Sequence, residues 1–115
     1  MITVCGFKEL NNAILKNKNK LLFLYFGSKE CTPCIELKNK IYENASEELS
    51  ELFLIYIDTD EPLNEEICSN YNIKFIPMQI FITLNNNQID IIDTIEGYDW
   101  TGLLFKYNRI IEKSL

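Results

Sequence analysis

Two cysteines separated by two residues, in Cys31-Thr32-Pro33-Cys34, form the stretch of the sequence best suited to chemistry. Two thiols at this spacing can form an intrachain disulfide. An apolar run at 21–26 precedes them and a helical pattern begins at Ile35, so the pair is expected where a strand meets a helix. The partial positive charge at the start of that helix favours the reactive thiolate form of the first cysteine. The sequence therefore predicts a dithiol redox site.

Two structural roles for the same cysteines are the alternatives. A zinc site needs about four ligands, commonly a second close pair of cysteines or histidines. The sequence has no histidine, and its other cysteines, Cys5 and Cys68, each stand alone. A purely structural disulfide is rare in the cytosol. We therefore predict no metal site, and we expect Cys5 and Cys68 to be small buried side chains, with a regulatory or intermolecular disulfide at Cys68 as the alternative.

The composition fits one domain, residues 1–115, because 47% of the side chains are apolar and can form a core. The net charge of −6 argues against nucleic-acid or anionic-membrane binding, which would need clustered Lys and Arg. The first residues lack the pattern of a signal peptide, and no apolar run approaches the ~20 residues that cross a bilayer. We expect a cytoplasmic protein.

Hydrophobic periodicity predicts an α/β chain in the order βαβαβαββα. The runs 21–26 and 52–57 are continuously apolar, as is typical of strands covered on both faces. The βαβ order implies parallel pairing at the start, and Asn85-Asn86-Asn87 suits a tight antiparallel hairpin near the end. The expected strands are 2–5, 21–26, 52–57, 78–84 and 88–95. The four expected helices contain Phe7, Ile35, Leu63 and Leu103, respectively.

This order of elements, with the cysteine pair at the second strand-to-helix junction, resembles the thioredoxin family. The resemblance extends from Phe7 to Ile111. It rests also on Phe26, the segment 57–61, Ile76-Pro77 and Gly97. It implies the thioredoxin fold, in which a central mixed sheet, parallel at first and ending in an antiparallel hairpin, is flanked by helices.

The resemblance also implies a mechanism. Cys31 would attack a protein disulfide and Cys34 would resolve the mixed disulfide, as in a thiol–disulfide oxidoreductase. Phe75, Ile76, Pro77 and Gly97 would bind the substrate, with the Ile76–Pro77 bond cis. The protein would bind no cofactor, would act as a monomer, and would be recharged by a flavoprotein similar to thioredoxin reductase.

Four residues around the cysteines are expected to modulate them: Tyr25, Glu30, Thr32 and Pro33. Tyr25 stands where the family has a buried aspartate, Glu30 where it usually has tryptophan, and Thr32 where it has glycine. Because these changes alter the groups that tune the dithiol, the alternative is a thioredoxin-like binding module with weak or vestigial redox activity.

Two groups near the expected site have open roles. Phe75, Ile76 and Tyr98 flank the loops beside the cysteines, either as an exposed apolar rim or as core packing. The acidic side chains of Asp58, Asp60 and Glu61 are expected to cluster at the start of the next helix rather than to bind a cation.

Overall fold

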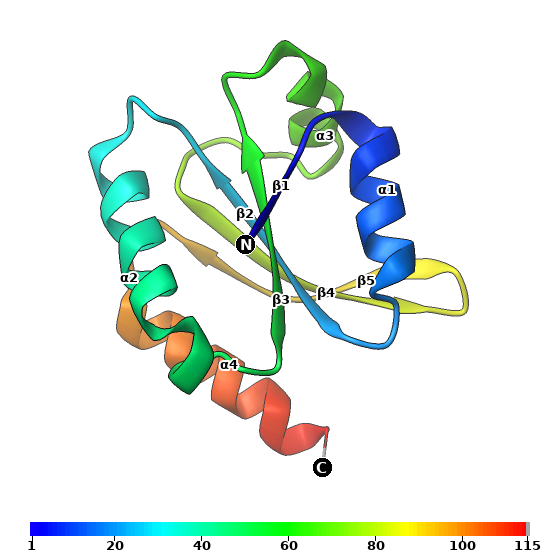
Figure 1. Cartoon of the computed structure of the whole chain (residues 1–115), viewed down its shortest axis with the longest axis vertical. Coiled ribbons are helices and arrows are strands. Elements are labelled where there is room, and N and C mark those ends of the chain that lie inside the picture. Colours follow the sequence, from blue (N-terminus) through cyan, green and yellow to red (C-terminus); the bar gives the residue numbers. More distant parts are fainter. Residues whose placement is uncertain (115) are drawn as a thin grey trace.

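The computed structural model describes residues 1–114, and its elements follow the predicted order (Figure 1). A short 3₁₀ helix, Pro62–Asn64, is added before the third helix. The strands are β1 (Ile2–Val4), β2 (Leu21–Gly27), β3 (Leu52–Asp58), β4 (Met78–Asn85) and β5 (Gln88–Glu96), and the helices are α1 (Gly6–Lys16), α2 (Thr32–Glu48), α3 (Glu65–Asn70) and α4 (Trp100–Lys113).

The strands of residues 1–114 form one mixed sheet in the order β1-β3-β2-β4-β5. β1, β3 and β2 are parallel, and β4 and β5 continue the sheet in antiparallel pairs, as predicted. Helices α1 and α3 lie over one face and α2 and α4 over the other (Figure 1). The predicted α/β fold with a mixed sheet is therefore confirmed.

Strand β2 is buried on both faces because its side chains alternate between two apolar clusters. Leu22, Leu24 and Phe26 pack on the α1 and α3 side, whereas Phe23 and Tyr25 pack on the α2 and α4 side. All five side chains have no exposed surface. Because β2 is fixed from both sides, the loop that follows it and the start of α2 have a rigid base at the end of the sheet.

The hairpin between β4 and β5 turns at Asn86 and Asn87, whose φ angles are 52° and 63°. Asparagine tolerates these positive values better than most residues, as the sequence predicted. Both strands are one residue longer than expected. None of the helices in the described part of the chain combines the length and the apolar character that a membrane span requires.

Candidate active site at the dithiol

Cys31 and Cys34 are joined in a disulfide at the start of α2, with their Cα atoms 5.2 Å apart. Cys31 is the N-cap residue of the helix, and its Sγ accepts a hydrogen bond of 3.2 Å from the backbone N–H of Cys34. The side chain of Cys31 is partly exposed, whereas Cys34 is 1% exposed. A partner molecule can therefore reach the first sulfur, and the second is protected.

Tyr25 lies beneath the dithiol and is fully buried in β2. Its hydroxyl donates a hydrogen bond to the backbone carbonyl oxygen of Cys34. Burial, with a smaller contribution from neighbouring Tyr56, raises the pKa of the Tyr25 phenol well above its usual value. The phenol therefore stays neutral at physiological pH and supplies a hydrogen-bond donor at the position where the family that the sequence resembles has a buried aspartate.

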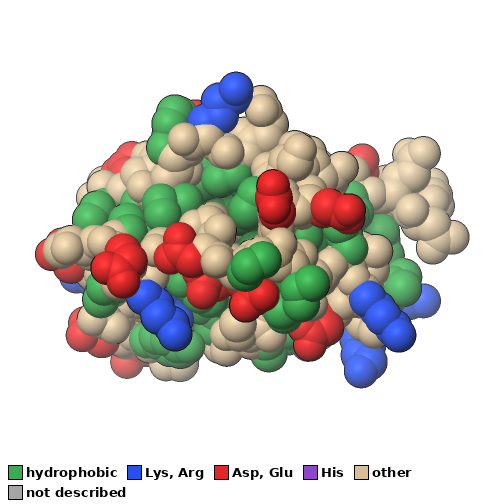
Figure 2. Space-filling view, turned by 90° about the horizontal axis from the view of Figure 1, so that it is seen from above, with side chains coloured by type: hydrophobic (Ala, Val, Ile, Leu, Met, Phe, Trp, Pro, Cys, Tyr) green, Lys and Arg blue, Asp and Glu red, His purple; other side chains and the backbone are tan. Residues whose placement is uncertain are grey.

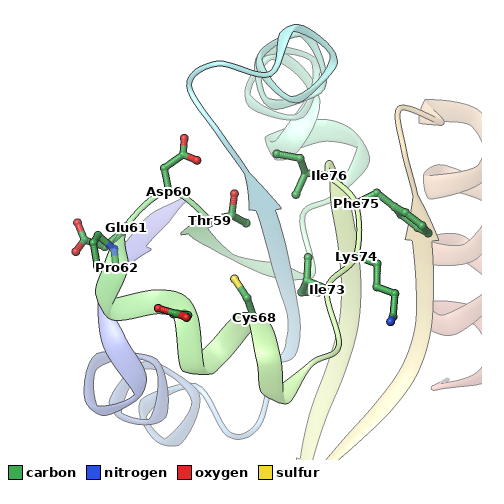
Figure 3. A pocket seen from close by; sticks show the side chains of 10 residues that line it. Thr59, Asp60, Glu61, Pro62, Cys68, Ile73, Lys74, Phe75 and Ile76 are labelled. Atoms are coloured by element: carbon green, nitrogen blue, oxygen red, sulfur yellow. The ribbon is translucent and has the colours of Figure 1, made fainter.

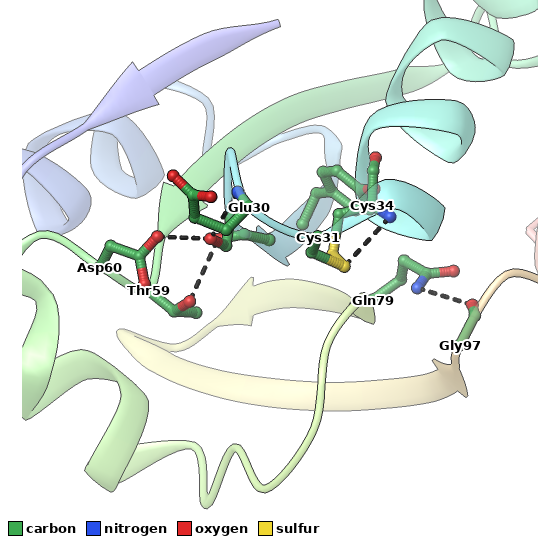
Figure 4. The surroundings of a disulfide bond; sticks show 10 residues. Glu30, Cys31, Cys34, Thr59, Asp60, Gln79 and Gly97 are labelled. Atoms are coloured by element: carbon green, nitrogen blue, oxygen red, sulfur yellow. Dashed lines mark hydrogen bonds between the residues drawn. A yellow bond between two sulfur atoms is a disulfide. The ribbon is translucent and has the colours of Figure 1, made fainter.

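The loop between β2 and α2 is tied to the end of β3. The hydroxyl of Ser28 donates a hydrogen bond to a carboxylate oxygen of Asp60, and it accepts one of 3.1 Å from the backbone N–H of Glu30 (Figure 4). The backbone N–H of Thr59 donates to the carbonyl oxygen of Gly27 at 2.9 Å. These contacts hold the segment that leads into Cys31.

The acidic cluster after β3 was only partly interpreted correctly. Glu61 does cap the 3₁₀ helix, because its side chain accepts a hydrogen bond from the backbone N–H of Leu63. Asp60 contacts the loop before the dithiol instead. Sequence reasoning missed the role of Ser28, although a hydroxyl and a carboxylate that follow adjacent parallel strands are expected at the same edge of a sheet.

The opposite wall of the site is formed by the ends of β4 and β5. The Ile76–Pro77 peptide bond is cis, and the carbonyl oxygen of Pro77 accepts a hydrogen bond of 2.8 Å from the backbone N–H of Gly97. Gly97 has a φ of 77°, a conformation that favours glycine. The predicted residues Pro77 and Gly97 are thus brought together.

Gln79 is a further polar residue of this wall that sequence reasoning missed. Its side chain is 0% exposed, and its Nε2 donates a hydrogen bond of 3.2 Å to the carbonyl oxygen of Gly97 (Figure 4). Its Oε1 has no partner in the described part of the chain. The available signal was the alternation of β4, which directs Gln79 to the same face of the sheet as Phe81.

Exposed aromatic side chains lie near the site. Phe75 is 54% exposed and Tyr98 43% exposed, as expected of an apolar rim, whereas Ile76 is partly buried and packs against the core. Figure 2, which views the face at the top of Figure 1, shows apolar and acidic side chains interleaved on it. Thr32 and Pro33 are also exposed, in the first turn of α2.

A cavity of about 480 Å³ lies between the loop after β3 and the segment 73–76. The sulfur of Cys68 faces it (Figure 3). Cys5 and Cys68 are free thiols. Both are partly exposed, so the prediction that they are buried was wrong. Burial first, and then nearby carboxylates, raise the pKa of both thiols.

In residues 1–114, no group of three or more His, Cys, Asp or Glu side chains lies together as a metal site would require.

The chain is similar to known thioredoxins in sequence and in structure. The thioredoxin family model matches residues 3–103. Thioredoxin 3 of Plasmodium falciparum is 28% identical over 90 residues, which cover 77% of this chain and 47% of that protein, so the match spans about half of its length. Thioredoxin-1 of Caenorhabditis elegans is 28% identical over 105 residues, covering 84% of this chain and 85% of that protein. The X-ray structure of Fasciola hepatica thioredoxin superimposes with a TM-score of 0.82 at 26% identity, covering 95% of this chain and 98% of that one.

Proposed function

Because the chain belongs to the thioredoxin family, we propose that it is a thiol–disulfide oxidoreductase that acts on protein substrates through Cys31 and Cys34. One observation carries the proposal. The two sulfurs are close enough to bond, and they differ in access, since Cys31 is partly exposed at the N-cap of α2 and Cys34 is buried. A dithiol with one accessible and one protected sulfur suits an attack followed by a resolution.

The reduced protein starts the reaction with the Cys31 thiolate. The thiolate attacks one sulfur of a substrate disulfide, and the other substrate sulfur leaves as a thiolate. Cys34, after losing its proton, attacks the sulfur of Cys31, so that the mixed disulfide breaks and the Cys31–Cys34 disulfide forms. Two electrons have then passed to the substrate. The hydrogen bond from the backbone N–H of Cys34 to the Cys31 sulfur favours the negative charge on Cys31.

We assign substrate binding to Phe75, Ile76, Pro77 and Gly97. An extended substrate segment would pair with the backbone at Ile76 in the manner of an added strand. The exposed ring of Phe75 offers apolar contact beside that backbone. The hydrogen bond between Gly97 and Pro77 holds the two loops together and supports this assignment.

The remaining expectations form part of the proposal. Residues 1–115 act as one domain and as a monomer, and the protein requires no bound cofactor. A flavoprotein of the thioredoxin-reductase type returns the disulfide to the dithiol. We also propose a cytoplasmic location, because the free thiols of Cys5 and Cys68 are typical of a reducing compartment.

Reduction of insulin disulfides in the presence of dithiothreitol tests the activity. The wild-type protein should accelerate reduction, and Cys31→Ser should abolish the acceleration. Cys68→Ser is the matched control, because it removes a partly exposed thiol outside the dithiol and should retain the activity. If the wild-type protein is no faster than Cys31→Ser, the protein is a binding module and the enzymatic proposal fails.

A second experiment identifies the substrates. The Cys34→Ser variant should hold mixed disulfides on Cys31, because the resolving thiol is missing. Incubation with a cell extract, followed by non-reducing electrophoresis, should show adducts that dithiothreitol releases. The double variant Cys31→Ser, Cys34→Ser should form none of these adducts.

A further inference from the structure

A cavity of about 320 Å³ lies behind the dithiol, on the side of α2 that faces the end of β3. Cys34 is nearly inaccessible at the surface, and its side chain borders this cavity. The charged side chains that line the cavity within residues 1–114 are both lysines, at positions 29 and 38. The residues that matter here are Ser28, Lys29, Cys34, Lys38, Tyr42 and Tyr56.

Gly27 lies beside both Tyr56 and Cys34. A Cβ atom at this glycine would lie 3.3 Å from a ring carbon of Tyr56 and 3.4 Å from the Cβ atom of Cys34. The tyrosine ring and the cysteine therefore border the same small space. The ammonium nitrogen of Lys38 lies 3.9 Å from the centroid of the Tyr56 ring, in the range of a cation–π contact. Lys38 is thus held against the ring that adjoins Cys34.

The other polar and charged groups near Cys34 belong to β2, β4, the loop before α2 and the end of β3. Tyr25 in β2 and Gln79 in β4 are uncharged, and Glu30 in the loop is exposed to solvent, which screens its charge. Two carboxylates at the end of β3 act in the same region, because the pKa of Tyr56 is raised by burial first and by these carboxylates second. They are Asp58 and Asp60, and the latter is hydrogen-bonded to Ser28.

We propose that Lys38 stabilises the thiolate of Cys34 across this cavity and thereby sets the pH at which Cys34 releases a bound substrate. This inference rests on the proposed function. In the step concerned, the Cys34 thiol loses its proton to solvent in the cavity. The resulting thiolate bonds to the sulfur of Cys31, the bond between Cys31 and the substrate sulfur breaks, and the substrate leaves as a thiolate. Lys38 touches none of the reacting atoms and acts as a positioning residue through its charge.

The ionisation of Cys34 can be measured without turnover. In the background Cys5→Ser, Cys31→Ser, Cys68→Ser, Cys34 is the remaining thiol, and ultraviolet absorbance of the thiolate follows its titration, with a further Cys34→Ser variant subtracted for the tyrosines. Lys38→Met should raise the titration midpoint by about 0.5 to 1 pH unit, because a favourable charge is lost. Lys38→Gln should do the same, and Lys38→Arg should preserve the midpoint.

Lys40→Met is the matched control, because Lys40 also lies on α2 and its ammonium nitrogen also lies over an aromatic ring. It is 5.8 Å from the centroid of the Trp100 ring. This variant should leave the midpoint unchanged. Thermal melting of each variant shows whether the fold is retained. An unchanged midpoint in both neutral Lys38 variants, or an equal rise in Lys40→Met, would overturn the inference.

Stopped-flow reaction with 5,5′-dithiobis(2-nitrobenzoate) separates this inference from the proposed function. Attack by Cys31 releases one thionitrobenzoate, and displacement by Cys34 releases the second. Lys38→Met should slow the second phase about 3- to 10-fold at pH 7, matching the shift above, and should leave the first phase unchanged. If the wild-type protein gives no fast first phase, the proposed function fails. If the second phase is equally fast in Lys38→Met, the role of Lys38 fails while the function stands.

Discussion

The buried hydroxyl of Tyr25 donates a hydrogen bond to the backbone carbonyl oxygen of Cys34. The contact links the centre of the sheet to the first turn of α2, nine residues further along the chain. It has two consequences. It fixes the helix turn that carries the resolving cysteine, and it places a neutral donor below that cysteine, so any charge that favours the thiolate has to come from another direction.

Replacing Tyr25 by phenylalanine removes only this hydroxyl. The free energy of unfolding should fall by about 0.5 to 1.5 kcal/mol, the usual net value of an intramolecular hydrogen bond. Urea denaturation of the oxidised protein measures the change. Tyr42→Phe is the control, because Tyr42 lies on α2 with an exposed side chain, and its loss of a hydroxyl should be neutral. Equal stability of both variants would show that the Tyr25 contact contributes nothing.

Stability should decrease at alkaline pH because three tyrosines are buried or partly buried. Burial raises the pKa of Tyr25, Tyr56 and Tyr71 in the folded protein, so near their ordinary pKa of about 10 the unfolded chain ionises first. The unfolded state then holds fewer protons than the folded state. The stability that is present below pH 10 is therefore lost as the pH rises through the pKa values of these tyrosines in the folded protein. Each residue contributes a slope of up to about 1.4 kcal/mol per pH unit.

Urea denaturation between pH 8 and pH 11 measures this slope. Tyr25→Phe should make it shallower, since one of the shifted groups is removed. Phenylalanine at the exposed position Tyr42 should leave it unchanged. A slope that is the same in wild-type protein and Tyr25→Phe would contradict the explanation.

The buried Oε1 atom of Gln79 has no hydrogen-bond partner in the described part of the chain, and a leucine at this position would remove it. Gln79→Leu loses the hydrogen bond to Gly97, worth about 1 kcal/mol, but relieves a buried acceptor that costs about 1 to 3 kcal/mol. The variant should therefore be as stable as the wild type or more stable by about 1 kcal/mol. Gln79→Glu should be less stable at pH 7 and should regain stability as the pH falls toward about 4, because burial raises the pKa of the carboxyl and the folded state is protonated first. A marked loss of stability in Gln79→Leu would mean that the bond to Gly97 dominates.

The elements of the fold could be predicted because their patterns are local. The continuous apolar run of β2 and the asparagines of the hairpin each specify their structure through burial or φ preference. The position of the cysteines followed from the same reasoning, because the end of a buried strand and the start of a helix bracket them.

The surroundings of the dithiol could not be predicted in the same way, since they depend on contacts between distant segments. Ser28 and Asp60 are 32 residues apart, and Gln79 meets Gly97 across 18 residues. Lys38 has the spacing of an ordinary surface lysine on α2, and only the structure shows that it lies on the Tyr56 ring and borders the same cavity as Cys34. The periodicity of one segment does not show which side chains from distant segments meet at the end of the sheet.

The acidity of Cys31 should depend on its neighbour Glu30. The Cys31 sulfur accepts a backbone hydrogen bond at the start of α2, which favours the thiolate, whereas a carboxylate on the preceding residue opposes it. Glu30 is exposed, so solvent screens its charge and we expect a small effect. The rate of Cys31 alkylation by iodoacetamide, measured against pH in a Cys5→Ser, Cys68→Ser background, should therefore show a lower midpoint in Glu30→Trp. Glu30→Gln separates the charge from the ring and should shift the midpoint in the same direction. If Glu30→Trp has an equal or higher midpoint, the carboxylate does not control the attacking thiol.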